Sequence, residues 1–286
     1  MSRAQIEALV AVLFLGTVPV TIRAIHANPW VIGLVRLAIG TVLVALVLRG
    51  SRNFRSLNRR ELGVLVLLGV IFSAHWAVYF VSIKMSSASV SSIGAATFGV
   101  HVALLGRLLL GQAPSLLQWL SIAVGFGGTV LVVGEFSFSD DIARGFLLSV
   151  FSAFLYAFLP ILHQRNKSIP VNVRTLGQYG FALPLFLCLL PRMDWDLRPV
   201  DWLGLAHLGV MATFVAHTMW IRATSVLPTH VSGMTYYLYV PIAMVLSRIF
   251  LGEPLVASRI AGAGLIVAAS CIGVFSQAKL KASETD

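Results

Sequence analysis

Long apolar runs constrain this chain more than any other feature of its sequence. They approach about twenty residues, recur along the whole chain, and are separated by polar or turn residues. An apolar segment of about 17 to 25 residues crosses the hydrocarbon core of a bilayer as a helix, whereas a transmembrane barrel shows shorter segments of alternating polarity. Only 11% of the residues are charged, too few to give a soluble domain a polar surface. The sequence therefore predicts an all-α integral membrane protein.

Ten transmembrane helices follow from the lengths of these runs. The first run is interpreted as a retained span and not as a signal peptide, because no small-residue cleavage motif follows it closely. The connections between runs are short, so no soluble domain is expected. The predicted spans are 4–23, 30–49, 62–83, 88–110, 117–134, 145–164, 174–190, 202–222, 230–251 and 259–277.

The basic residues divide unevenly between the two faces that ten spans define. The face with both termini carries thirteen Lys and Arg against four Asp and Glu, and the segment from Arg49 to Arg60 holds five of the thirteen. The other face carries seven of each sign. Because loops rich in Lys and Arg resist translocation, we expect both termini in the cytoplasm. The formal net charge of +10 is thus an orientation signal, and no nucleic-acid partner is expected.

The two halves of the sequence match at a constant offset of 141 residues. Pro19 corresponds to Pro160, Arg107 to Arg248, and the segment Leu110-Gly111-Gln112 to Leu251-Gly252-Glu253. Five spans per half is an odd number, so the second half is expected to enter the membrane from the opposite face, as an inverted repeat. Such repeats are typical of transporters that bind substrate near the midplane between the halves. We place the two repeats at residues 1–137 and 143–278.

These features resemble the EamA-type members of the drug/metabolite transporter superfamily. Those proteins have two tandem repeats with Leu-Gly-Glu at the end of each fourth helix, a pattern from which the first copy here departs through Gln112. The segment from Trp30 to Gly40 resembles the family's second helix, and the aromatic content resembles the YddG-type aromatic amino acid exporters. The resemblance implies ten helices in two inverted five-helix repeats, a bacterial inner-membrane location, and a central cavity lined by helices 1, 3, 4, 6, 8 and 9.

Polar and aromatic side chains recur on one face of several predicted spans, at the spacing i, i+4 and i+7. A histidine or tyrosine in the middle of a span lacks a hydrogen-bond partner among lipid tails, so these faces are expected to point toward protein or a wet cavity. Packing between helices is the alternative role for each of them. The candidate substrate-binding residues are His75, Tyr79, Phe98, His101, Tyr156, His163, His217, Trp220, Tyr236 and Tyr239.

Three further residues are candidates for structural or gating roles. Arg36 lies about seven residues into a span, where a guanidinium is costly and where no Asp or Glu lies deep enough to pair with it. It has two possible roles, a contact with headgroups or helix-end carbonyls and a contact with a substrate carboxylate. Pro19 and Pro160 each remove a backbone hydrogen bond from the first helix of a half. They are candidate bending points, although proline is also common in membrane helices.

The sequence predicts a transporter and not an enzyme. It contains no P-loop, G-x-G-x-x-G or H-E-x-x-H motif, and Cys188 and Cys271 lie in apolar runs, so we expect no catalytic residues, no metal and no cofactor. The expected partners are an amino acid substrate and the lipid bilayer, with no oligomer required. The lack of carboxylates inside the spans favours facilitated, gradient-driven export, with proton coupling through histidines as the alternative. The alternatives are a carrier of other metabolites or drugs, a histidine-based intramembrane enzyme, and a scaffold or receptor that transports nothing.

Overall fold

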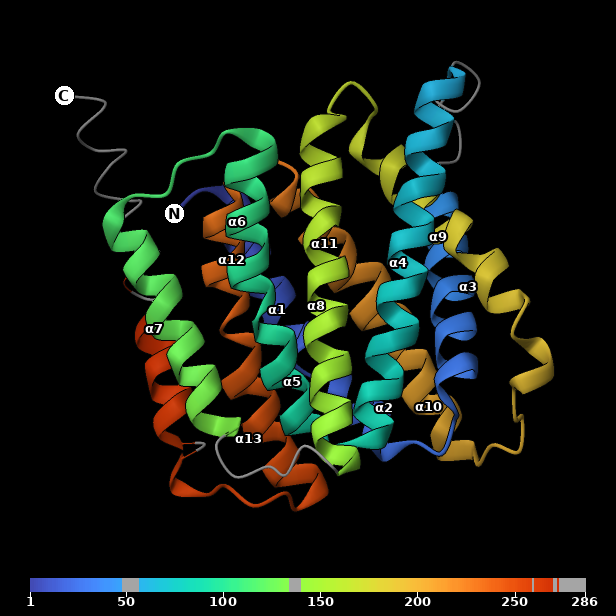
Figure 1. Ribbon diagram of the computed structural model, residues 1–286. Helices are drawn as coiled ribbons and strands as arrows, with labels where there is room; N and C mark the ends of the chain where they lie inside the picture. The colour runs from blue at the N-terminus through green and yellow to red at the C-terminus, as the bar shows by residue number, and fades with distance from the viewer. Residues whose placement is uncertain (48–56, 134–139, 259, 270–271, 273–286) are drawn as a thin grey trace.

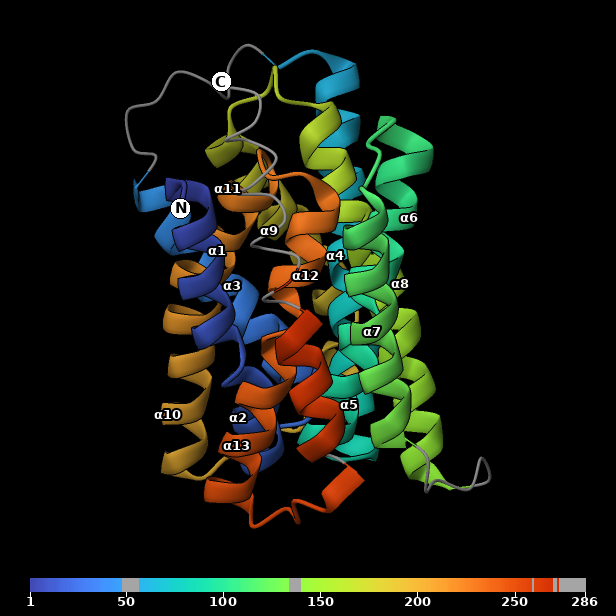
Figure 2. The same ribbon diagram turned by 90° about the vertical axis from the view of Figure 1, so that its left-hand side faces the viewer.

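A computed structural model gives the arrangement of the helices. It describes residues 1–47, 57–133, 140–258, 260–269 and 272, and no β-strand occurs in these ranges. The helices run along a common axis and pack side by side in one bundle, with α7 and α10 on opposite sides of it (Figures 1 and 2). In chain order the elements are α1 Arg3–Leu15, α2 Val18–Ala24, α3 Pro29–Val47, α4 Arg59–Met85, α5 Ala88–Ala96, α6 Phe98–Leu110, α7 Leu116–Val133, α8 Asp141–Arg165, α9 Val171–Leu187, η2 Leu190–Arg192, α10 Pro199–His207, η3 Leu208–His217, α11 Thr218–Thr224, α12 Thr229–Tyr236 and α13 Tyr239–Leu251.

Seven helical stretches in the described part of the chain are long and apolar enough to cross a membrane. They are Arg3–Ala24, Pro29–Val47, Arg59–Met85, Ala88–Leu110, Asp141–Arg165, Pro199–Thr224 and Thr229–Leu251, and they coincide with seven of the ten predicted spans. The protein is therefore an all-helical, multi-pass membrane protein.

The other three predicted spans are not among these seven stretches. Helices α7, with 18 residues, and α9, with 17, are as long as the spans predicted at 117–134 and 174–190, and a last helix is described over Ile260–Ala269. Apart from Ile272, the rest of the last predicted span lies outside the described residues. So do Cys271 and several of the basic residues used for the orientation, namely Arg49, Arg52, Arg55, Arg259, Lys279 and Lys281.

Local sequence signals explain several helix ends. Asn58 begins α4 with a capping box, in which its side chain accepts from the Glu61 backbone N–H and the Glu61 carboxylate accepts from that of Asn58. At their C-terminal ends, α6 and α13 both stop at a glycine in the left-handed region, Gly111 with φ 66° and Gly252 with φ 69°. A residue with a Cβ is strained in that conformation. This requirement explains the glycine in both copies of the Leu-Gly motif.

Helix boundaries repeat at the same offset of 141 residues as the sequence. The first and last residues of α6 and α13 correspond, and α5 and α12 begin at corresponding residues, Ala88 and Thr229. The corresponding helices run in opposite directions, since α6 ends at the top of Figure 1 and α13 ends at the bottom.

The two candidate bending points differ in their surroundings. Pro19 lies in the first turn of α2. Just before it, between Leu15 and Val18, the helix of the first predicted span is interrupted. Pro160 lies inside α8, which continues as one helix from Asp141 to Arg165. The first span is thus broken near its proline, whereas bending at Pro160 remains a prediction.

Candidate substrate site

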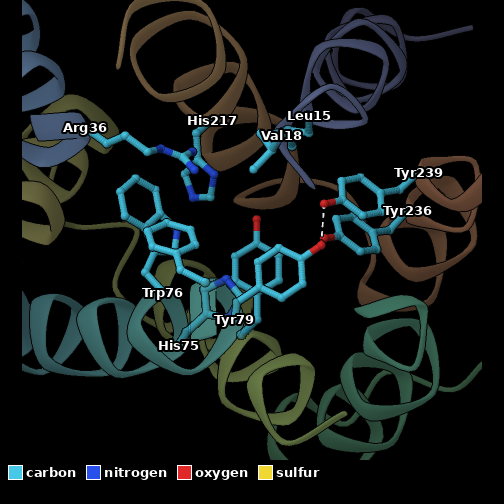
Figure 3. Close-up of a pocket in the computed structure, with 11 residues that line it drawn as sticks. Leu15, Val18, Arg36, His75, Trp76, Tyr79, His217, Tyr236 and Tyr239 are labelled. Atoms are coloured by element: carbon cyan, nitrogen blue, oxygen red, sulfur yellow. Dashed lines mark hydrogen bonds between the residues drawn. The ribbon is translucent and has the colours of Figure 1, made fainter. Parts of the chain in front are cut away.

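A buried cavity lies between side chains of the two halves of the chain. From the first half α1 to α4 contribute to it, and from the second half α8, η3, α12 and α13 contribute. We call it the central cavity; Figure 3 shows its lining side chains directed toward one another. They belong to Leu15, Val18, Arg36, His75, Trp76, Tyr79, Phe80, Tyr156, His217, Tyr236 and Tyr239.

Tyrosines form one wall of the central cavity and connect its two halves. The hydroxyl groups of Tyr79, on α4, and Tyr239, on α13, lie 2.6 Å apart and share a hydrogen bond (Figure 3). Tyr236 stacks on Tyr239 with ring centroids 5.0 Å apart and an angle of 10° between the planes. All three side chains are buried, so their rings offer a flat apolar surface to the cavity.

His75 is fixed by a second contact between the halves. Its Nδ1 lies 3.0 Å from the backbone carbonyl oxygen of Ser152 on α8, and the Ser152 hydroxyl donates to the His75 carbonyl at 2.9 Å. Nδ1 also lies 2.7 Å from the Ser152 hydroxyl, and in the tautomer with its proton on Nδ1 the ring donates to Ser152 while the hydroxyl donates to the His75 carbonyl. The imidazole is nearly parallel to the rings of Tyr156, at 4.4 Å, and Tyr79, at 6.0 Å. The hydrogen bonds therefore orient a short aromatic stack.

Arg36 extends from α3 into the cavity, on the side opposite the tyrosine wall (Figure 3). Only 1% of the residue is exposed, so it does not reach the surface of the bundle. Its Nε donates to Thr213 Oγ1 at 3.0 Å, and its guanidinium lies over the rings of Trp76, at 4.1 Å, and Phe80, at 5.2 Å. One terminal nitrogen, Nη1, has no hydrogen-bond partner. No ion pair joins Arg36 to a carboxylate of the described residues.

A π-helical segment, η3, supplies the residues that face Arg36. In its wider turn the Thr213 hydroxyl donates to the carbonyl of Leu208, five residues earlier, at 2.8 Å. The Tyr179 hydroxyl donates to the Thr213 carbonyl at 3.1 Å. The same segment carries His217 into the cavity lining, where its Nε2 has no hydrogen-bond partner. Local unwinding of the helix thus accompanies the most polar part of the cavity.

A second, smaller cavity adjoins the central one, and Tyr156 and His217 line both. Three of the sequence candidates, Pro160, His163 and Trp220, lie here and not in the central cavity. His163 Nε2 is 2.8 Å from the amide oxygen of Gln178. The α8 candidates therefore face both cavities: Tyr156 lines the two of them, and Pro160 and His163 line only the smaller one.

Two predicted site residues line neither cavity. The Phe98 ring packs behind the wall, against Tyr236 at 4.8 Å and Tyr156 at 5.0 Å. His101 is only partly buried and contacts Phe154 at 5.6 Å. The interruption at Thr97 between α5 and α6 explains this, because it resets the helical phase that the spacing from Gly94 assumes.

Several lining residues are absent from the sequence prediction, namely Leu15, Val18, Trp76 and Phe80. The repeat offset was a signal for two of them. Trp76 corresponds to His217 and Leu15 to Tyr156, and both members of each pair line the central cavity. The rings of Trp76 and His217 also meet edge to face at 6.1 Å.

The central cavity is nearly closed in this state. Its free volume is about 30 Å³ and that of the adjoining cavity is about 10 Å³. Such volumes hold one or two water molecules and not an amino acid. A larger crevice of about 270 Å³ lies between α3, α9, η3 and α11, with Arg222 at its edge. Substrate binding in the central cavity therefore requires the surrounding side chains or helices to separate.

Comparison with known proteins assigns the family. The model of the EamA-like transporter family matches residues 3–134 and again residues 143–275. The chain belongs to this family. An uncharacterized transporter of Bacillus subtilis, YxxF, is 20% identical over 260 residues, which make up 88% of this chain and 83% of the relative. A crystal structure with 17% identity superposes with a TM-score of 0.79 over 98% of this chain and 99% of its own.

Membership of the EamA-like family identifies the chain as a membrane transporter, with a small molecule as the expected cargo. Within the described residues, no group of three or more His, Cys, Asp or Glu could hold a metal ion. Of the functions considered for the buried histidines, transport is the one that the family supports.

Proposed function

We propose that this EamA-like transporter exports amino acids, aromatic ones included, across a bacterial inner membrane. One observation carries the proposal. The two halves jointly enclose an aromatic cavity that contains an arginine with an unpaired donor, Arg36. Stacked tyrosine rings provide the surface on which an aromatic or aliphatic side chain packs, and a guanidinium is the natural partner of a carboxylate. The lining contains no Asp or Glu, which argues against cationic drugs as the main cargo.

The two halves act as inverted repeats in this proposal. The offset of 141 residues that relates the sequences also relates helix boundaries, and α6 and α13 run in opposite directions. The start of α1, with Arg3, and the start of α4, with Arg59 and Arg60, lie at the same end of the bundle (Figure 1). Because basic residues favour the cytoplasmic side, we assign that end to the cytoplasm and the termini with it.

Two contacts between the halves favour alternating access. We call them the Gln112 cap and the Glu253 cap. The Gln112 amide oxygen, just after α6, accepts from the backbone N–H and the hydroxyl of Thr229, at 2.7 and 2.9 Å, where α12 begins. The Glu253 carboxylate, just after α13, accepts from the backbone N–H groups of Ala88 and Ser89, at 3.0 and 3.1 Å, where α5 begins.

The caps occupy equivalent positions at opposite ends of the bundle, since α6 ends at the top of Figure 1 and α13 at the bottom. Each satisfies backbone donors that a helix start otherwise leaves unpaired. Opening the bundle at one end separates one helix start from its cap and leaves the other pair intact. This arrangement provides the two alternative closures that alternating access requires.

The direct test is flux of labelled amino acids into proteoliposomes. Tyr79→Ala and Trp220→Ala are each expected to lower phenylalanine flux about tenfold or more. Each removes an aromatic surface from a cavity, and such a surface contributes about 1 to 3 kcal/mol to the binding free energy. Expression and thermal stability are measured alongside. His101→Ala is the matched control, since His101 lines neither cavity, and its flux is expected to equal that of the unmodified protein. Flux no greater than that of empty liposomes for every aromatic amino acid refutes the proposed substrate class.

A further inference from the structure

The central cavity contains one permanently charged group, and its charge is positive. Among its lining residues only Arg36 is a Lys, Arg, Asp or Glu. The position equivalent to Arg36 in the second half is Gly177, where an added Cβ would lie 2.8 Å from the Leu65 side chain. The repeat therefore supplies a cation from one side only. The two sides of the cavity therefore differ although the repeats are related. One side, at α3, is cationic, and the tyrosine wall lies across from it (Figure 3).

Two hydrogen-bonding atoms on this cationic side lack a partner. They are Arg36 Nη1 and His217 Nε2, and both residues are at most 3% exposed. A guanidinium remains protonated in proteins, and leaving one of its N–H groups unpaired in a buried site is costly. Thr213 and the rings of Trp76 and Phe80 stabilise part of the charge but supply no negative group. A ligand with two acceptor oxygens would pair with Arg36 Nη1, and also with His217 in the tautomer that carries its proton on Nε2.

The cavity offers much less to an ammonium group. Its lining includes no carboxylate, and its tyrosine hydroxyls, of which those of Tyr79 and Tyr239 pair with each other, are neutral acceptors and bind a cation less strongly than a carboxylate does. The indole face of Trp76, the best surface for a cation, is already occupied by Arg36. A ligand ammonium would also approach the uncompensated guanidinium, with which it interacts unfavourably.

On the basis of the proposed function, we infer that the site recognises its cargo by the carboxylate and does not require the α-amino group. The carboxylate binds Arg36, with His217 beside it, and the aromatic body lies toward Tyr236 and Tyr239. Small aromatic monocarboxylates are then substrates of the same site as aromatic amino acids, whereas the matching amines are not.

Three ligands that share one phenyl ring test this inference: phenylalanine, 3-phenylpropionate, which lacks the amino group, and phenethylamine, which lacks the carboxylate. Each unlabelled compound is tested as a competitor of labelled phenylalanine for flux into proteoliposomes. Each is also assayed for thermal stabilisation of the purified protein. We expect 3-phenylpropionate to compete within about tenfold of phenylalanine, and phenethylamine to be about 100-fold weaker or worse. Arg36→Gln is expected to abolish stabilisation by 3-phenylpropionate, and Arg165→Gln, at the exposed end of α8, to leave it unchanged.

The possible results separate the inference from the proposed function. We call recognition by the carboxylate alone the carboxylate rule. If phenylalanine is transported but 3-phenylpropionate does not compete, or if phenethylamine competes equally well, this rule is wrong and amino acid export stands. If phenylalanine shows no flux but 3-phenylpropionate stabilises the protein through Arg36, the rule stands and the proposed cargo is wrong. Stabilisation by none of the three ligands overturns the rule as well.

Discussion

Arg36→Met is expected to lower amino acid flux about 100-fold or more while the melting temperature stays the same or rises. The two effects separate because the guanidinium is buried without a carboxylate partner. Removing it deprives a substrate carboxylate of its partner, which decreases binding. Removing it also relieves an uncompensated charge, and replacing buried charges with apolar residues of similar size is often neutral or stabilising.

Methionine suits this test because its side chain keeps much of the contact with Trp76 and Phe80. Thr213 loses the donor of Arg36 but still donates to the Leu208 carbonyl, so no hydroxyl proton is left unpaired. Flux is measured in proteoliposomes and unfolding in detergent. Arg165→Met, at an exposed position, is the control for loss of one positive charge. A large fall in melting temperature together with normal flux would mean that Arg36 has a structural role.

The two caps are expected to bias the transporter in opposite directions. Glu253→Ala removes two hydrogen bonds to a charged acceptor, each worth about 1.5 to 3 kcal/mol, from the end that we assign to the periplasm. Loss of even about 1.4 kcal/mol from one closed state changes its population about tenfold. The cavity is then open to the periplasm about ten times more often. Gln112→Ala is expected to open it toward the cytoplasm instead.

Labelling of one cavity position from each side measures this bias. The probe is Val18→Cys, since Val18 is buried and lines the central cavity, in a chain whose Cys188 and Cys271 are replaced by serine. We expect a membrane-impermeant maleimide to react about tenfold faster from the periplasmic side in Glu253→Ala, and from the cytoplasmic side in Gln112→Ala. Glu253→Gln is expected to have an intermediate effect, because its amide keeps one acceptor oxygen, as at Gln112, but not the second. Identical rates in all variants from both sides would exclude a closing role for the caps.

The sequence predicts much of the bundle because hydropathy and spacing encode it directly. Seven spans, the helix-ending glycines Gly111 and Gly252, and several facing aromatic residues follow from patterns along the chain. The position of His101 outside both cavities has a local cause, since a helix interruption at Thr97 changes which side of α6 faces inward. Spacing rules assume one continuous helix, and Thr97 carries no signal strong enough to predict a break.

Other features of the site depend on tertiary structure. No pattern predicts the π-helical turn that places Thr213 and His217 beside Arg36, because that turn depends on packing against α3 and α9. The Gln112 cap and the Glu253 cap likewise depend on tertiary structure, because packing of the two halves brings each cap to its helix start. The Leu-Gly-Gln and Leu-Gly-Glu segments mark only the positions of the capping residues. Trp76 is absent from the predicted site because an apolar residue in a span is typical of packing, although its position 141 residues before His217 is a signal that it lines the same cavity.

Photoaffinity labelling tests most directly whether the central cavity is the substrate site. An aromatic amino acid with a photoreactive diazirine is bound to the purified protein, irradiated, and located by mass spectrometry of the digested chain. We expect labels on α4 and α13, at residues such as Trp76, Tyr79 and Tyr239, and we expect excess phenylalanine to suppress them. Phenylalanine-sensitive labels confined to the larger crevice beside Arg222 would contradict it.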